Sequence, residues 1–153
     1  FRMRSLAVLV LLAISSVGGK MTTYNFHNNC NVQVQATFND EPASVLPINP
    51  GGSVSQDRNT GEINDLHVLV SNGVGGLTRV GFYVHYVFMA GARMHYYIDL
   101  SKGFDTGVKV APPLGGPTLI CSNSACAGNG NPLNGTAWSE WQWVSPFDIT
   151  FCP

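Results

Sequence analysis

The apolar residues of this chain come in short runs in which apolar and polar side chains alternate. Residues 32–38 show the pattern most clearly, with Val, Val, Ala and Phe at every second position. Such alternation places one face of a strand against a core, and no stretch sustains the helical period of about 3.6 residues. Turn-forming residues, among them 17 Gly and 9 Pro, lie mostly between the runs. The pattern predicts an all-β fold, a sandwich or a barrel, in a single domain.

The expected strands are short and follow one another closely. They occupy residues 24–27, 32–38, 65–71, 78–89, 94–100, 107–110, 138–144 and 147–152. Residues 39–64 are rich in Asp, Pro, Asn, Gly and Ser, so this stretch is expected to consist mainly of turns. Ala90-Gly91-Ala92 predicts the turn of a hairpin between two strands.

Composition and charge exclude several classes of protein. Only 11% of the residues are charged, against about 25% in an average globular protein, which argues against a coiled coil or a helical bundle. The hydrophobic content of 44% argues against a disordered chain. The net charge of −1 lacks the basic excess typical of a nucleic-acid binder, so no nucleic-acid partner is expected.

The N-terminal segment predicts the compartment. Two arginines precede an unbroken apolar run over residues 6–14, and small residues follow it. This order is typical of a secretory signal peptide, here residues 1–19 with Met3 as the start, although a buried strand or an anchor is the alternative. The run is shorter than the ~20 residues that span a bilayer, and no second one follows. We therefore expect residues 20–153 to form a secreted, extracellular domain.

The four cysteines are Cys30, Cys121, Cys126 and Cys152, and all of them lie in the expected mature domain. An even number in a secreted chain indicates two disulfides, for which three pairings are possible. A zinc site is the rival interpretation, but only one pair of cysteines is close in sequence and the histidines lack metal-ligand spacing. We predict no metal and no cofactor.

Several ordered motifs resemble those of the thaumatin-like family, which includes osmotin and pathogenesis-related proteins. The segment from Tyr97 to Asp105, Tyr-Ile-Asp-Leu-Ser-Lys-Gly-Phe-Asp, is similar to a family segment that precedes a short strand ending in Pro, here 108–112. The ending 149–153 resembles the family's Val-Phe-Cys-Pro. Residues 26–30 resemble its opening strand with Asn-x-Cys, and 50–53 resemble the Gly-Ser turn that follows.

The resemblance implies a β-sandwich of two antiparallel sheets. It also implies that Cys30 and Cys152 join the first and last strands. In larger members, the cysteines at the positions of Cys121 and Cys126 pair with a disulfide-rich second domain. That domain and its cysteines are missing here, so a pairing of Cys121 with Cys126 is the simplest expectation.

The family's acidic cleft, built from an Arg, a Glu and several Asp and linked to β-1,3-glucan, is only partly matched. Asp99 stands at a matching position, but the family's Glu falls near Val87, and residues 77–97 contain no acid. Lys102 replaces a common Asp, and Asp105 replaces the usual Asn. The missing Glu favours binding over catalysis.

Glycoside hydrolysis usually needs two carboxylates, and Asp99 and Asp105 are the candidate pair near the matched segment. The alternative is that Asp99 caps a turn and Asp105 is a solvated loop residue. Asp99 is also a candidate glycan contact.

Four aromatic residues are candidate sugar contacts: Tyr83, Tyr97, Trp141 and Trp143. Flat aromatic faces can pack against sugar rings, but the same side chains also fill sandwich cores. Asn134-Gly135-Thr136 is a glycosylation sequon in a loop-like stretch.

The function indicated by the resemblance is that of a secreted, monomeric binding protein in defence, antifungal activity or host–microbe contact. Its expected partner is cell-wall polysaccharide, β-1,3-glucan, or a surface protein. A weak β-1,3-glucanase is one alternative, and a module or inhibitor that acts on a protein partner is another.

Overall fold

The computed structural model describes residues 21–39, 44–59, 66–72, 78–87, 91–101, 103–113, 116–124, 126, 138–140 and 146–153. The predicted signal peptide, residues 1–19, lies outside these ranges. The strands are β1 (Met21–Asn28), β2 (Val34–Phe38), β3 (Leu46–Ile48), β4 (Ser53–Asn59), β5 (Leu66–Ser71), β6 (Thr78–Val87), β7 (Gly91–Asp99), β8 (Val108–Ala111), β9 (Leu119–Cys121), β10 (Trp138–Glu140) and β11 (Phe147–Phe151). Across the described part of the chain, no helix has the length and hydrophobicity needed to cross a membrane.

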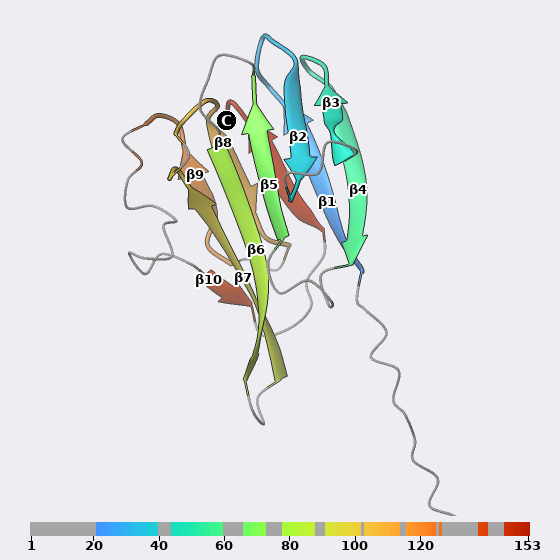
Figure 1. Ribbon diagram of the computed structural model, residues 1–153, viewed down its shortest axis with the longest axis vertical. Helices are drawn as coiled ribbons and strands as arrows, with labels where there is room; N and C mark the ends of the chain where they lie inside the picture. Colours follow the sequence, from blue (N-terminus) through green and yellow to red (C-terminus); the bar gives the residue numbers. More distant parts are fainter. Residues whose placement is uncertain are drawn as a thin grey trace, which may run out of the picture.

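The strands form two sheets that pack face to face (Figure 1). One sheet has five strands in the order β4-β1-β11-β8-β9, and the other has six in the order β10-β7-β6-β5-β2-β3. Alternate residues of each strand face the space between the sheets, as the burial pattern of β2 shows for Val34, Ala36 and Phe38. The predicted all-β sandwich is confirmed.

Aromatic rings fill the space between the sheets. The Tyr24 ring of β1 meets the Phe82 ring of β6 edge to face at 4.8 Å between centroids, and Phe147 of β11 lies 5.1 Å from Phe82. These contacts join strands of opposite sheets, and all three side chains are fully buried. Because the core takes one side of each strand, the other side forms two outer faces, one on each sheet.

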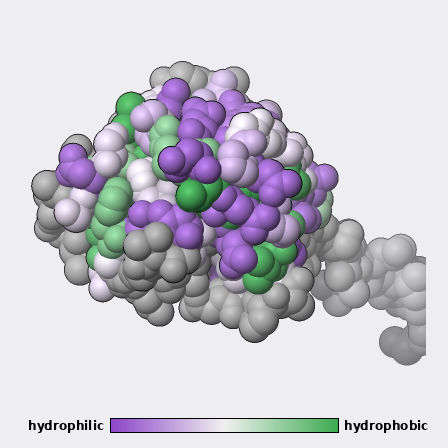
Figure 2. Space-filling view, turned by 90° about the horizontal axis from the view of Figure 1, so that it is seen from above, coloured by the Kyte–Doolittle hydropathy of each residue, from purple (hydrophilic) through white to green (hydrophobic). Residues whose placement is uncertain are grey.

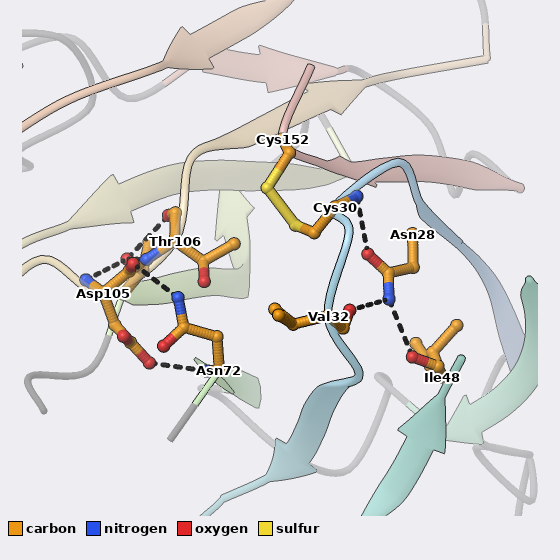
Figure 3. The surroundings of a disulfide bond; sticks show 9 residues. Asn28, Cys30, Val32, Ile48, Asn72, Asp105, Thr106 and Cys152 are labelled. Carbon is orange, nitrogen blue, oxygen red and sulfur yellow. Dashed lines mark hydrogen bonds between the residues drawn. A yellow bond between two sulfur atoms is a disulfide. The ribbon is translucent and has the colours of Figure 1, made fainter. Parts of the chain in front are cut away.

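The five-stranded sheet differs from the expected antiparallel arrangement at one pair of strands. β1 and β11 run in parallel, from Tyr24 opposite Phe147 to Asn28 opposite Phe151. Parallel strands end at the same edge of a sheet, which brings Cys30 and Cys152 together just beyond them. These two cysteines form a disulfide with 5.1 Å between their Cα atoms. Figure 3 shows this bond beside the turn that leads from β1 toward β2.

The second disulfide joins Cys121, the last residue of β9, to Cys126, with 5.5 Å between the Cα atoms. Cys30–Cys152, the pairing that the family resemblance implies, is therefore present, and so is the expected pairing of Cys121 with Cys126. They leave no free cysteine among the described residues.

Three strands lie where the sequence indicated turns or left the structure open: β3, β4 and β9. β4 is at a sheet edge, and its residues are polar except for Val54, so its alternation does not appear as a hydrophobic pattern. Its Arg58 replaces an apolar contact with a cation–π contact, because the guanidinium carbon lies 4.5 Å from the centre of the Phe38 ring. β7 begins at Gly91, where the sequence predicts the turn of the hairpin.

Candidate functional site

Asp99 and Arg79 form a charged pair on the outer face of the six-stranded sheet. Asp99 is the last residue of β7, and it lies opposite Arg79, the second residue of β6. Their neighbours Val80 and Ile98 face the core, so the pair points to the other side. Arg79 Nη1 lies 3.4 Å from Asp99 Oδ2, and both side chains are largely buried, with exposed fractions of 24% and 14%.

A tight turn fixes the orientation of the Asp99 carboxylate. The Ser101 amide donates to Oδ1 at 2.8 Å, and the Ser101 hydroxyl donates to Oδ2 at 2.8 Å. The turn closes through Gly103, whose amide donates to the Leu100 carbonyl at 2.9 Å. Gly103 has a φ of 99°, a conformation that favours glycine, so the Asp-Leu-Ser-Lys-Gly sequence dictates this local geometry.

These contacts also set the charge of Asp99. Burial raises the pKa of its carboxyl group, but the two hydrogen bonds from Ser101 and the charge and hydrogen bond of Arg79 outweigh burial, so its pKa lies below the ordinary value. Asp99 is therefore an anion throughout the physiological range. It can accept hydrogen bonds from ligand hydroxyls beside a guanidinium that donates them, but it is poorly suited to donate a proton as a general acid.

Asp105 lies in the connection between β7 and β8 and has different partners. Its Oδ2 accepts a hydrogen bond from the Asn72 amide at 2.6 Å, and its carbonyl accepts one from Asn72 Nδ2 at 3.1 Å. Its own amide donates to the Thr78 hydroxyl at 3.2 Å. Asp105 thus joins the end of β5 to the start of β6, just before β8 begins, and its contacts are those of a structural residue.

The candidate aromatic residues are only partly described. Tyr97 lies on the same side of β7 as Asp99, yet it is only 6% exposed. Its ring packs against Gly81 so closely that a Cβ at position 81 would overlap it. In the ladder, β6 places Tyr83 opposite His95. Trp141, Trp143 and the Asn134 sequon lie outside the described residues.

Arg79 is the member of the site that the sequence analysis missed. A hairpin turn centred on Gly91 would have placed Tyr83 opposite Asp99. The observed register instead joins Val87 to Gly91 and brings Arg79, four residues before Tyr83 on β6, opposite Asp99. In the sequence, Arg79 stands out as a charged residue near the start of an apolar strand. Only the correct register of the hairpin identifies it as the partner of Asp99.

Within the described ranges, no cluster of three or more His, Cys, Asp or Glu side chains is arranged to hold a metal ion. The donor groups around Asp99 are a guanidinium, a hydroxyl and an amide, which suit hydrogen-bonded ligands.

Comparison by sequence gives no match to a family model and no match to a curated protein. Comparison by structure does. The protein elicitor MoHrip2 from Magnaporthe oryzae superposes with a TM-score of 0.67 at 15% identity, over 86% of this chain and 99% of that one. The thaumatin-like xylanase inhibitor TLXI superposes with a TM-score of 0.61 at 17% identity, over 85% of this chain and 99% of that one.

This chain has a thaumatin-like fold. At 15% and 17% identity, the likeness shows the fold alone. The superposition spans both neighbours almost end to end, so the compact thaumatin-like sandwich is shared as a whole. The expected resemblance is confirmed, including the small form of the fold.

Proposed function

We propose that this thaumatin-like protein acts outside the cell as a binding protein in defence or host–microbe contact. Its proposed ligand is cell-wall β-1,3-glucan, held on the outer face of the six-stranded sheet. The observation that carries the proposal is the charged pair of Arg79 and Asp99, which the Ser101 turn holds in a fixed orientation. A rigid acceptor beside a rigid donor is the arrangement that a hydroxyl-rich ligand requires.

Binding is favoured over hydrolysis because a glycosidase needs one carboxyl group that carries a proton and a second that does not. The lowered pKa of Asp99 leaves it without a proton near neutral pH. The Asp105 carboxylate accepts a hydrogen bond from the backbone of Asn72, so it serves the connection between loops. The residue types of a catalytic pair are present, but their contacts support structure and binding.

Two further observations support an extracellular role in defence or host–microbe contact. Both disulfides are typical of an oxidising compartment, in agreement with the signal peptide expected at residues 1–19. One structural neighbour is named a protein elicitor and the other a xylanase inhibitor, and such names describe encounters between organisms. An antifungal role, a monomeric state and a glycan on Asn134 are parts of the same proposal.

A second candidate function is the inhibition or recognition of a protein partner. The observation in its favour is the thaumatin-like xylanase inhibitor among the structural neighbours. This candidate predicts that the charged pair contacts a protein surface and that polysaccharide does not compete.

The proposal is tested by co-sedimentation with insoluble β-1,3-glucan, with cellulose and chitin as controls. The oxidised protein is purified from the medium of a eukaryotic host that expresses the whole chain. We expect selective pelleting with β-1,3-glucan and a loss of about five- to tenfold in affinity for Asp99→Asn. The matched control is Asp148→Asn, an exposed aspartate on the other sheet, which should pellet like the wild type.

The same proteins are assayed for release of soluble sugar from the glucan. No release by the wild type removes the weak-glucanase alternative. Release that Asp99→Asn abolishes, with pelleting retained, would establish the enzyme instead. Folded protein that pellets with none of the three polysaccharides would contradict glucan binding and favour the protein partner.

A further inference from the structure

A hollow of about 320 Å³ lies on the six-stranded sheet, and neither Arg79 nor Asp99 is among its lining residues. Five residues line it: Val32, Gln33, Gln35, Ser71 and Asn72. None of them carries an ionisable side chain. Its volume is at the lower end of the ~300–1,000 Å³ typical of small-molecule sites, so it suits a small ligand or the end of a chain.

Hydrogen bonds hold both sides of the hollow. On one side, Val32 belongs to the turn after β1, and its carbonyl accepts a hydrogen bond at 2.9 Å from the buried Asn28 side chain. That side chain also donates to the Ile48 carbonyl at 2.7 Å and accepts from the Cys30 amide at 2.9 Å. On the other side, Asn72 is held by its two hydrogen bonds with Asp105. Figure 3 shows the two anchored sides, with the Cys30–Cys152 disulfide drawn above Val32.

The other three lining residues are held by a side-chain contact at Gln33 and by the backbone ladder at Gln35 and Ser71. Gln33 Nε2 donates to Asn49 Oδ1 at 2.9 Å. Gln35 and Ser71 lie opposite each other in the ladder between β2 and β5. A site whose walls keep their positions before the ligand arrives loses little conformational entropy on binding. The shape of the hollow is therefore set by the fold before a ligand binds.

The lining chemistry indicates the class of ligand. Amide and hydroxyl groups can both donate and accept hydrogen bonds, and the exposed fraction of Val32, 43%, adds an apolar surface. β2 has a neighbouring strand on each side, so its backbone is engaged in ladders and cannot pair with an extended peptide. This arrangement favours a neutral, hydroxyl-rich ligand over a charged ligand or a peptide strand.

The hollow and the charged pair share one end of one sheet. β5 links them, because Leu69 lies opposite Arg79 while Ser71 lies opposite Gln35. β5 and β7 both end toward the top of Figure 1. Figure 2 looks down on this end and shows a mainly hydrophilic surface with isolated apolar residues. With adjacent strands about 4.8 Å apart, β2 is about 10 Å from β6, so a short oligosaccharide can reach both.

We propose that the hollow is a second carbohydrate subsite. It binds one neutral sugar unit of an oligosaccharide, while hydroxyl groups of the neighbouring units contact Arg79 and Asp99. This inference rests on the proposed function for the choice of a glycan, and it adds where and by which residues an uncharged unit is bound. Gln35 and Asn72 supply the amide contacts, and Val32 supplies the apolar contact.

The test is calorimetric titration with laminaritriose, a neutral β-1,3-linked trisaccharide, and with trigalacturonate, an anionic one. We expect laminaritriose to bind more tightly than trigalacturonate. Gln35→Ala should weaken laminaritriose binding by about five- to tenfold, as the loss of one or two hydrogen bonds requires. Gln56→Ala, which removes the same side chain from β4 of the other sheet, should change it by less than about twofold.

The possible outcomes separate this inference from the proposed function. If Gln35→Ala binds laminaritriose as the wild type does, while Asp99→Asn does not, the hollow is no subsite and glucan binding at the charged pair stands. The same holds if the wild type pellets with insoluble glucan but does not bind the trisaccharide. Equal or tighter binding of trigalacturonate overturns the neutral specificity. A wild type that binds neither soluble nor insoluble glucan overturns both proposals.

Discussion

The two outer faces of the sandwich use polar residues in opposite ways. On the five-stranded sheet, exposed side chains bond mainly to one another across strands: Thr23 donates to Asp57 at 2.7 Å, Ser55 donates to Asn25 at 2.8 Å, and Asn25 Nδ2 donates to Asp148 at 3.0 Å. We call these residues the polar ladder. On the six-stranded sheet, Asp99 and Asn72 are half-buried and are held by turns and loops.

The difference suggests that the polar side chains of the five-stranded face serve solubility and those of the six-stranded face serve recognition. Exposed hydrogen bonds of the polar ladder compete with water and contribute little stability, while they satisfy the side chains that a ligand would otherwise bind. Partly buried groups that are hydrogen-bonded to a turn or loop keep fixed positions at the surface, as a binding site requires. We therefore expect binding on the six-stranded face and none on the polar ladder.

The largest expected effect comes from the Cys30–Cys152 disulfide, which anchors the turn that carries Val32. Replacing both cysteines with Ala should lower the free energy of unfolding by about 2–5 kcal/mol, because the bond closes a loop with a sequence separation of 122. Removing Cys121–Cys126, with a separation of 5, should cost about half as much. Guanidinium denaturation measures both, and equal losses would contradict the loop-length argument.

Gly81→Ala should produce the next largest effect, on the six-stranded face alone. The new Cβ would overlap the Tyr97 ring, so the ring or the strand must move. We expect a loss of about 1–3 kcal/mol in the free energy of unfolding, together with a change in tyrosine near-UV circular dichroism. An unchanged stability and spectrum would show that Tyr97 does not pack against position 81.

Asp99→Asn should have a smaller effect on stability, and the effect should depend on pH. Because the pKa of Asp99 is lowered in the folded state, its contribution is fully present above the unfolded-state pKa of about 4 and is lost as the pH falls through the lower folded-state value. At pH 7 the variant should be about 1 kcal/mol less stable than the wild type, and near pH 2 the difference should shrink. Urea unfolding at both values checks this, and a difference that grows in acid would have the wrong sign.

The smallest effect is expected for the polar ladder. Ser55→Ala removes one exposed hydrogen bond, so the free energy of unfolding should change by less than about 0.5 kcal/mol and glucan pelleting should not change. Thermal unfolding and co-sedimentation measure the two. A clear loss of pelleting would move the binding surface to the five-stranded sheet.

Much of the fold could be predicted because burial leaves a local pattern. Alternation around Phe26 and Val34 marked strands whose apolar sides form the core, and the cysteine positions with the terminal motif pointed to the joined ends. β4 was missed because Val54 is its only apolar residue, and Arg58 packs on the Phe38 ring where an apolar residue was expected.

The site was less predictable because it depends on which strands meet. Asp99 was recognised from its turn sequence, but its partner Arg79 follows from the register of a hairpin and has no local signature. The hollow requires the turn at Val32 to approach the loop at Asn72, and that approach depends on the buried Asn28 and on Asp105. No periodicity in the chain encodes contacts over such separations.

Both proposals place the ligand on the six-stranded face, at the end where β5 and β7 finish. Amide chemical-shift mapping of the isotope-labelled, oxidised protein during titration with laminaritriose tests this placement directly. We expect the shifts to leave the polar ladder unchanged and to concentrate on Gln35, Ser71, Asn72, Arg79, Asp99 and Ser101. Shifts centred on Thr23, Asn25 and Asp57 would contradict it.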